Sequence, residues 1–279
     1  MPENPSLDGC REKQRRGMKH LQDLDNAIAE WVGEPGVDPK PYEISGDFRL
    51  NSREYVFKGK LLKPLDDLLL WGVMFGDAIH NLRSALDHLV WQLVLVNKKR
   101  PSGSNQFPIC DTGANYWSAG WKDGKKTPST RERRLEGVSD AHKALIDEAQ
   151  PYRARVPPSA IHALSALRDL SNYDKHRLVH LTDFAVDFPS REALDNLFIV
   201  NADAGERIGT RFEPFRYDRE TEVFAVEYSC PGPNPEVSVQ GNPPLGIGIS
   251  ESRARFSHLQ GLAFDIGSII EEFAPDFPV

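Results

Sequence analysis

The segment from Pro64 to Val96 constrains the fold more than any other part of the chain, because it is long and apolar on almost every side. Pro64 suits the first turn of a helix, and Asp66 and Asp67 suit the positive end of the helix dipole. A helix that is apolar nearly all round is normally buried. The segment therefore predicts a central helix in the middle of a helical bundle.

Further helices are predicted where apolar residues recur three or four positions apart. These helices cover about residues 11–32, 139–149, 158–173 and 251–273. The stretch 97–138, by contrast, is rich in Gly, Pro, Ser, Lys and Trp and is predicted to be irregular. A loop of this length inside a domain is usually functional or mobile.

Strands are predicted in two places. Residues 42–62 contain two β-prone pieces divided by Asn51-Ser52, which predicts a hairpin. Several short strands then follow one another over about residues 178–250 without helices between them, which favours an antiparallel sheet. The expected fold is therefore α+β in one domain: a helical part over 1–177, a β-rich part over 178–250 and a closing helix over 251–273.

Composition indicates a soluble chain with an acidic balance. The net charge is −7, which argues against general coating of nucleic acids, although the segment from Lys122 to Arg134 is locally basic. Trp117 and Trp121 lie in or beside this segment and could stack on bases or anchor the loop to the core. Three distant cysteines, the lack of an apolar leader and the absence of any apolar run of about 20 residues predict a cytoplasmic protein with no membrane segment.

Polar residues interrupt the central apolar helix in a coherent way. At 100° per residue they form one stripe, opposite Leu82, Leu86 and Leu89. Burying such groups without partners costs about 1–3 kcal/mol each, so we expect a buried site with partners elsewhere in the chain. The polar residues of this stretch are Asp77, His80, Asn81, Arg83, Ser84, Asp87 and His88.

The partners are expected in a second polar segment at residues 168–180, around the end of a helix. Four of the eight histidines of the chain fall in these two stretches, and we expect the stretches to face each other. One interpretation is structural: a network of ion pairs and hydrogen bonds that fixes how two helices meet. The polar residues of the second segment are Arg168, Asp169, Asn172, Asp174, Lys175, His176, Arg177 and His180.

Arg83 and His88 are separated by four residues on the predicted helix, and this spacing resembles the Arg-x4-His motif of the HEPN (higher eukaryotes and prokaryotes nucleotide-binding) ribonucleases. The resemblance covers the helix around residues 77–96. It implies a helical bundle, often dimeric, that cleaves RNA without a metal or other cofactor. His88 would then move the proton and Arg83 would stabilise phosphoryl charge. The chain also resembles uncharacterised bacterial proteins that carry NLRSALDH-like and DKHR-like segments together.

Two other functions remain open from the residues. Asp77 with His80, and His176 with His180, could hold a metal for hydrolysis or oxygen chemistry. The polar cluster could also be purely structural in a non-catalytic interaction protein. The sequence contains no G-x-S-x-G, H-E-x-x-H or phosphate-loop motif. Because Arg83, Lys175 and Arg177 are cationic, we favour RNA cleavage or nucleotide-phosphate binding, with Asp77, His80, Asn81, Asp87, Asp174, Lys175, His176 and Arg177 supporting Arg83 and His88.

Overall fold

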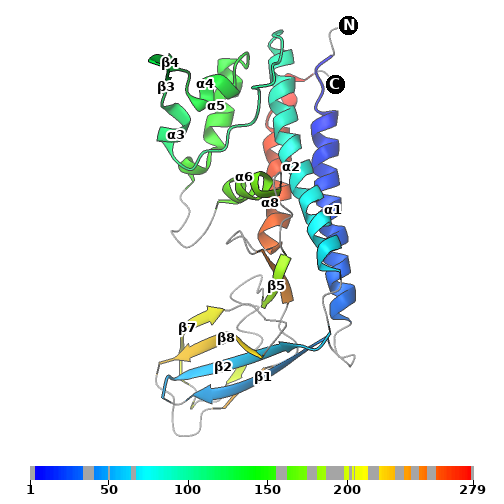
Figure 1. The fold of residues 1–279 in the computed structure, drawn as a ribbon, viewed down its shortest axis with the longest axis vertical. Coiled ribbons are helices and arrows are strands. Elements are labelled where there is room, and N and C mark those ends of the chain that lie inside the picture. The colour runs from blue at the N-terminus through cyan, green and yellow to red at the C-terminus, as the bar shows by residue number, and fades with distance from the viewer. Residues whose placement is uncertain are drawn as a thin grey trace.

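The computed structural model has an α+β fold, in which a group of helices lies at one end and a four-stranded sheet at the other (Figure 1). The predicted fold class is therefore confirmed. The structure describes residues 4–33, 41–49, 51–63, 67–154, 162–174, 181–186, 198–200, 203, 205–212, 220–229, 236–239, 245–249 and 256–277.

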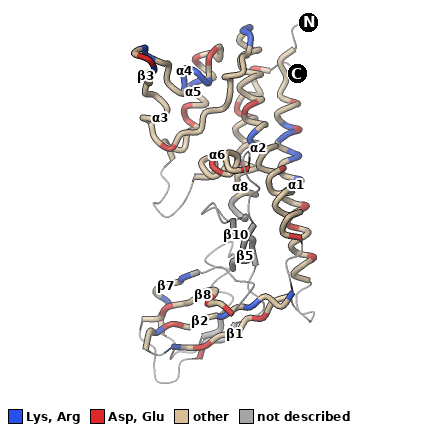
Figure 2. Tube along the Cα trace, in the orientation of Figure 1, with Lys and Arg blue, Asp and Glu red and all other residues tan. Residues whose placement is uncertain are grey.

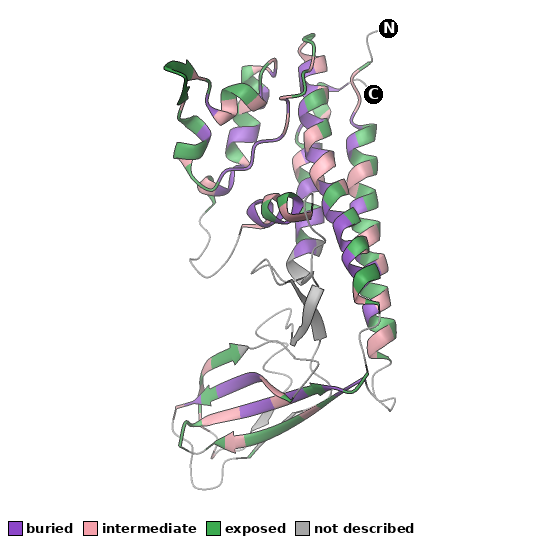
Figure 3. Ribbon diagram, viewed as in Figure 1, coloured by how far each residue is buried: buried purple, intermediate pink, exposed green. Residues whose placement is uncertain are grey.

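Helices α1 (Asp8–Val32) and α2 (Leu68–Val96) run side by side in opposite directions and form the long axis of the molecule (Figure 1). Charged residues occur along the whole of α1, whereas α2 carries few (Figure 2). The central helix is predicted correctly, since α2 is buried along most of one side (Figure 3). Thirteen of its residues are buried, among them Phe75, Ile79, Leu82, Leu86 and Leu89.

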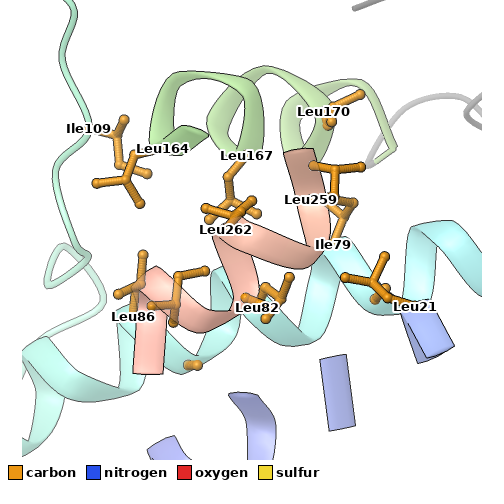
Figure 4. Packing of buried hydrophobic residues seen from close by; sticks show 14 of the residues in the cluster. Leu21, Ile79, Leu82, Leu86, Ile109, Leu164, Leu167, Leu170, Leu259 and Leu262 are labelled. Carbon is orange, nitrogen blue, oxygen red and sulfur yellow. The ribbon is translucent and has the colours of Figure 1, made fainter. Parts of the chain in front are cut away.

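Helices α6 (Ala163–Asp174) and α8 (Phe256–Glu271) complete the bundle. The apolar face of α6 supplies Leu164, Leu167 and Leu170, which pack among leucines and isoleucines of α2 and α8 (Figure 4). The C-terminal helix therefore closes on the helical part. It also lies along α1, where Arg11 donates to Glu271 at 2.7 Å. Short 3-10 turns occur at Pro151–Arg153 and Ala274–Asp276.

The stretch predicted to be irregular contains short regular elements. They are α3 (Gly113–Trp117), β3 (Gly120–Lys122), β4 (Lys125–Thr127) and α4 (Thr130–Arg134), followed by α5 (Asp140–Glu148). The start of α4 has a local cause, because the Ser129 hydroxyl accepts from the backbone N–H of Glu132 and the Glu132 carboxylate accepts from Ser129. This capping box fixes the first turn of a helix that is otherwise too short to be stable alone.

The four-stranded sheet combines an early and a late part of the chain. Its order is β1-β2-β8-β7, with every pair antiparallel, and it combines β1 (Tyr42–Arg49) and β2 (Glu54–Leu61) with β7 (Arg207–Phe212) and β8 (Thr221–Tyr228). Phe57 and Phe224 stack across the β2–β8 pair with ring centroids 4.0 Å apart. The predicted hairpin is confirmed, but it is part of the larger sheet rather than a separate unit.

The remaining described strands form two-stranded pairs. β5 (Leu181–Val186) pairs with β10 (Leu245–Ile249), and β6 (Phe198–Val200) pairs with β9 (Val237–Val239), both antiparallel as expected. Within the described residues, none of the helices has both the length and the apolar character needed to cross a bilayer.

Candidate functional site: an arginine-lined pocket

The pocket lies where α2, α4, α6 and the segment 106–109 meet. Its volume is about 450 Å³. Arg83 comes from α2, Arg134 from the end of α4 and Arg168 from α6, and these arginines are the only charged residues in the described lining. The other lining residues are apolar or neutral and polar: Gln106, Phe107, Pro108, Ile109, Thr130, Ser171 and Asn172.

The segment 106–109, which forms one wall of the pocket, is held to α2 by Arg83 and Asp87. The Arg83 Nη2 group donates to Asp87 Oδ1 at 2.8 Å and to the Phe107 carbonyl at 2.7 Å. The Phe107 backbone N–H donates to the same carboxylate oxygen at 2.9 Å. Both backbone groups of Phe107 are therefore bonded to side chains one helical turn apart, which anchors this segment on the helix.

One end of the Arg83 guanidinium remains unused by this clamp. The Arg83 side chain is only 14% exposed, and its Nη1 atom is buried without a hydrogen-bond partner in the described structure. A buried donor without a partner costs about 1–3 kcal/mol, and more when the group is charged. Arg83 thus keeps donor capacity that the described residues leave unused.

Arg134 is held in place by hydrogen bonds to Asn105 and Gln106. Its side chain donates to the Gln106 carboxamide, and its backbone carbonyl accepts from the Asn105 side chain at 3.2 Å. Burial lowers the pKa of Arg134, and the positive charges of Arg133 and Arg83 act in the same direction. No described carboxylate forms an ion pair with Arg134, so its charge is balanced less completely than that of Arg83.

Arg168 is oriented by two carboxylates outside the described lining. It donates to Asp111 and to Asp169, each at 2.7 Å. Burial acts to raise the pKa of Asp111, but hydrogen bonds from Ser165 and Arg168 hold that pKa below its ordinary value. Asp111 therefore stays charged at neutral pH and fixes the position of Arg168 at the edge of the pocket.

Arg83 and His88 do not share this pocket. His88 is exposed and faces α1, where an added Cβ on Gly9 would lie 3.5 Å from its Nδ1 atom. Partial desolvation of the ring and the charge of Lys13 lower the pKa of His88, while Asp87 opposes the shift. Five residues turn an α-helix by about 140°, and this rotation separates the two side chains.

Asp174 at the end of α6 lies against α2 near Asp77 and His80. A Cβ added to Gly76 would come 2.5 Å from its Oδ1 atom. Burial raises the pKa of Asp174 and Asp77 adds to this shift, whereas His80 opposes it. Asn81 lies on the same stretch of α2 and donates to the backbone carbonyl of Asp77 at 2.8 Å. The described parts of the two polar segments therefore do meet, as the sequence led us to expect.

The expectation that the polar stripe is buried is wrong for several of its members. Asp77, His80 and His88 are exposed, and Asn81, Ser84 and Asp87 are only partly buried. The reason is that α2 packs through Leu82, Ala85, Leu86 and Leu89, which leaves its polar side in contact with water. These groups need no buried partners.

Lys175, His176, Arg177 and His180 lie outside the described residues. In the part of the chain that is described, no three or more His, Cys, Asp or Glu side chains gather where a metal ion could bind. The metal alternative depends on His176 and His180 and therefore stays a prediction.

The sequence does not indicate that Arg134, Gln106 and Thr130 belong to a site. Arg134 is the end of a basic run, and the other two are isolated polar residues of a stretch predicted to be irregular. The Ser129-x-x-Glu132 capping box is a readable signal, since it predicts a helix that begins after Ser129 and includes the basic residues that follow. Nothing local to the sequence, however, places that helix beside α2.

Comparison of the chain with protein-family models, with curated proteins and with solved structures finds no match.

Proposed function

We propose that the protein binds a phosphate-bearing ligand, such as a nucleotide or RNA, in the pocket lined by Arg83, Arg134 and Arg168. The observation that carries this proposal is the convergence of three guanidinium groups on one cavity with no acidic residue in its described lining. Guanidinium groups bind phosphate oxygens through paired, charge-assisted hydrogen bonds. The volume of about 450 Å³ is within the usual range for small-molecule sites.

The lining also offers neutral donors beside the arginines. The hydroxyls of Thr130 and Ser171 and the amide of Asn172 can bond to a ribose or to further phosphate oxygens. An anion would also offset the repulsion between Arg83 and Arg134. The geometry supports binding better than it supports cleavage by Arg83 and His88, because these two residues lie on different sides of α2.

Arg134 is the best residue for a test, because Arg83 also clamps the backbone of Phe107. We expect Arg134→Gln to weaken AMP binding by at least about tenfold, the loss typical of one charged hydrogen-bonding partner. Arg133→Gln is the matched control, since Arg133 is exposed on the same helix and is not among the lining residues. Isothermal titration calorimetry measures both affinities, and equal affinities for the two variants would refute the proposal.

RNA cleavage is tested separately. Labelled single-stranded RNA is incubated with the protein in EDTA, and cleavage that disappears in His88→Ala would assign the reaction to His88. AMP binding should be unchanged in this variant, because His88 is not part of the described pocket lining. If RNA remains intact with the unmodified protein, the cleavage hypothesis fails while the binding proposal stands on the calorimetry.

A further inference from the structure

The hairpin β3–β4 projects from the same part of the molecule as α4. Trp121 pairs with Lys126, and Lys122 pairs with Lys125 across the turn. Asp123 and Gly124 occupy the turn with φ of 51° and 72°. Positive φ at both positions is the signature of a type I′ turn, the connection that best fits the twist of a two-stranded hairpin. The hairpin is therefore a defined element of structure.

Trp121 is 75% exposed on this hairpin. Its indole has no ring partner and no side-chain hydrogen bond within the described structure. Trp117 nearby is different, because its Nε1 group donates to the Tyr152 hydroxyl at 3.0 Å and the Arg131 guanidinium lies 4.8 Å from its ring centroid. Trp117 anchors the segment, whereas the indole of Trp121 is open to solvent.

The charge around Trp121 is strongly positive. Residues 120–134 contain six basic and two acidic residues, although the chain as a whole carries a net charge of −7. One of the two acids, Glu132, is engaged in the capping box with Ser129. The basic residues are Lys122, Lys125, Lys126, Arg131, Arg133 and Arg134. Figure 2 shows Lys and Arg on both the hairpin and α4.

The hairpin is close to the arginine-lined pocket along the chain. Thr130 lines the pocket and is four residues after Lys126, the partner of Trp121. Four residues span at most about 14 Å, and paired residues on adjacent strands lie about 5 Å apart. The Cα atoms of Trp121 and Thr130 are thus within about 20 Å, a distance that a few nucleotides can bridge.

We propose that the β3–β4 hairpin binds single-stranded nucleic acid, with Trp121 stacking on an unpaired base of a strand whose phosphate enters the arginine-lined pocket. This inference rests on the proposed function and extends it from a nucleotide to a strand. An exposed aromatic ring among cations is the arrangement by which proteins hold single strands. A lipid surface fits less well, because Lys125, Lys126 and Thr127 make the second strand of the hairpin polar.

The test compares four variants with the unmodified full chain. Fluorescence anisotropy measures binding of a labelled ten-nucleotide uridine RNA, and calorimetry measures binding of AMP. We expect Trp121→Ala to weaken RNA binding by about tenfold, the typical loss of one stacked base, and to leave AMP binding unchanged. Trp121→Phe should restore most of the RNA affinity. Trp91→Ala, at a tryptophan on α2, should change neither affinity, and Arg134→Gln should weaken both.

The outcomes separate the two proposals. If Trp121→Ala binds the RNA normally while Arg134→Gln loses AMP, the pocket is real and the hairpin inference is overturned. If Arg134→Gln keeps its AMP affinity, the proposed function itself fails. Binding to phosphatidylserine vesicles that requires Trp121, with no binding to RNA, would overturn the inference in favour of a lipid surface.

Discussion

At the scale of single residues, Arg83 uses only part of its guanidinium to hold the pocket together. Arg83 employs Nη2 to hold Phe107 and Asp87, while Nη1 has no partner in the described structure. Such a division is possible because a guanidinium carries five donors in a rigid plane. The two hydrogen bonds from Nη2 fix the plane of the Arg83 guanidinium, and this plane sets the direction of its remaining N–H donors.

The carboxylate of Asp174 gives a pH-dependent prediction. Burial raises its pKa, so between an unfolded value of about 3.9 and the higher folded value the folded protein binds more protons than the unfolded chain. Stability should therefore fall as pH rises through this window. We expect Asp174→Asn to raise the urea midpoint slightly at pH 7, with no gain at pH 3.

Asp25→Asn supplies the control for this experiment, because Asp25 is exposed on α1. It should change the urea midpoint no more than an ordinary surface substitution does. A constant effect of Asp174→Asn across the titration would contradict the assignment of a raised pKa to this carboxylate.

At the scale of elements, the spacing of α1 and α2 depends on glycine. A Cβ at Gly17 would lie 2.6 Å from Leu82 Cγ and 3.2 Å from the carbonyl oxygen of Ala78. Leu82 is fully buried and cannot move aside. The two helices therefore approach more closely than any larger residue at this position would allow.

Gly17→Ala should consequently destabilise the protein, even though alanine is the better helix former. Overpacking costs about 1–3 kcal/mol, against a gain of up to about 1 kcal/mol in helix propensity. Gly261→Ala in α8 is the counterpart, since a Cβ there would meet nothing within 4 Å. We expect Gly261→Ala to stabilise by up to about 1 kcal/mol. Urea denaturation measures the change in the free energy of unfolding for both variants. If both variants were stabilised, or both destabilised, the result would contradict this packing.

Local sequence patterns predict most of the helices and strands, but they do not predict which elements pack or pair with one another. The stripe of α1, the apolar character of α2 and the apolar run Val223–Val226 in β8 are readable because each depends on a few neighbouring residues. β7 gives a weaker signal, since its sequence RIGTRF places glycine and two arginines in a strand at the edge of the sheet. Edge strands need little apolar alternation, so their sequences carry a weak signal.

The candidate site shows the same division. That Arg83 and Asp174 lie on facing segments follows from two unusual polar stretches beside apolar ones. That Arg134 joins Arg83 depends on Asn105 and Gln106, whose bonds to the end of α4 are tertiary contacts. The side on which His88 lies depends on α1 packing against α2, which the helical period alone does not determine.

At the scale of the whole molecule, the sheet depends on residues that are far apart in the sequence. Phe57 and Phe224 are both buried and stack on each other, one in the hairpin and one in β8. β8 is the strand that joins this hairpin to β7. Losing that contact should loosen the connection between the early and late parts of the sequence.

We expect Phe224→Ala to lower the free energy of unfolding by about 3–5 kcal/mol, the usual cost of removing a buried ring. Ile208→Ala on β7 is the control, because Ile208 is 59% exposed and its truncation should cost less than about 0.5 kcal/mol. Guanidinium denaturation followed by circular dichroism measures both. A loss below about 1 kcal/mol for Phe224→Ala would show that the ring pair does not hold the sheet together.

The order of the strands also has a consequence for how the protein is made. The hairpin is complete at Leu61, but β8, which covers the free edge of β2, ends only at Tyr228. At about 5–20 residues per second, a ribosome needs roughly 10 to 30 s to synthesise the intervening chain. Throughout that time the nascent polypeptide has an unpaired edge on β2, and the interval between α1 and α8 is longer still. The sheet can therefore reach its native form only after Tyr228 has been synthesised, and the helical part only after Glu271 has been synthesised.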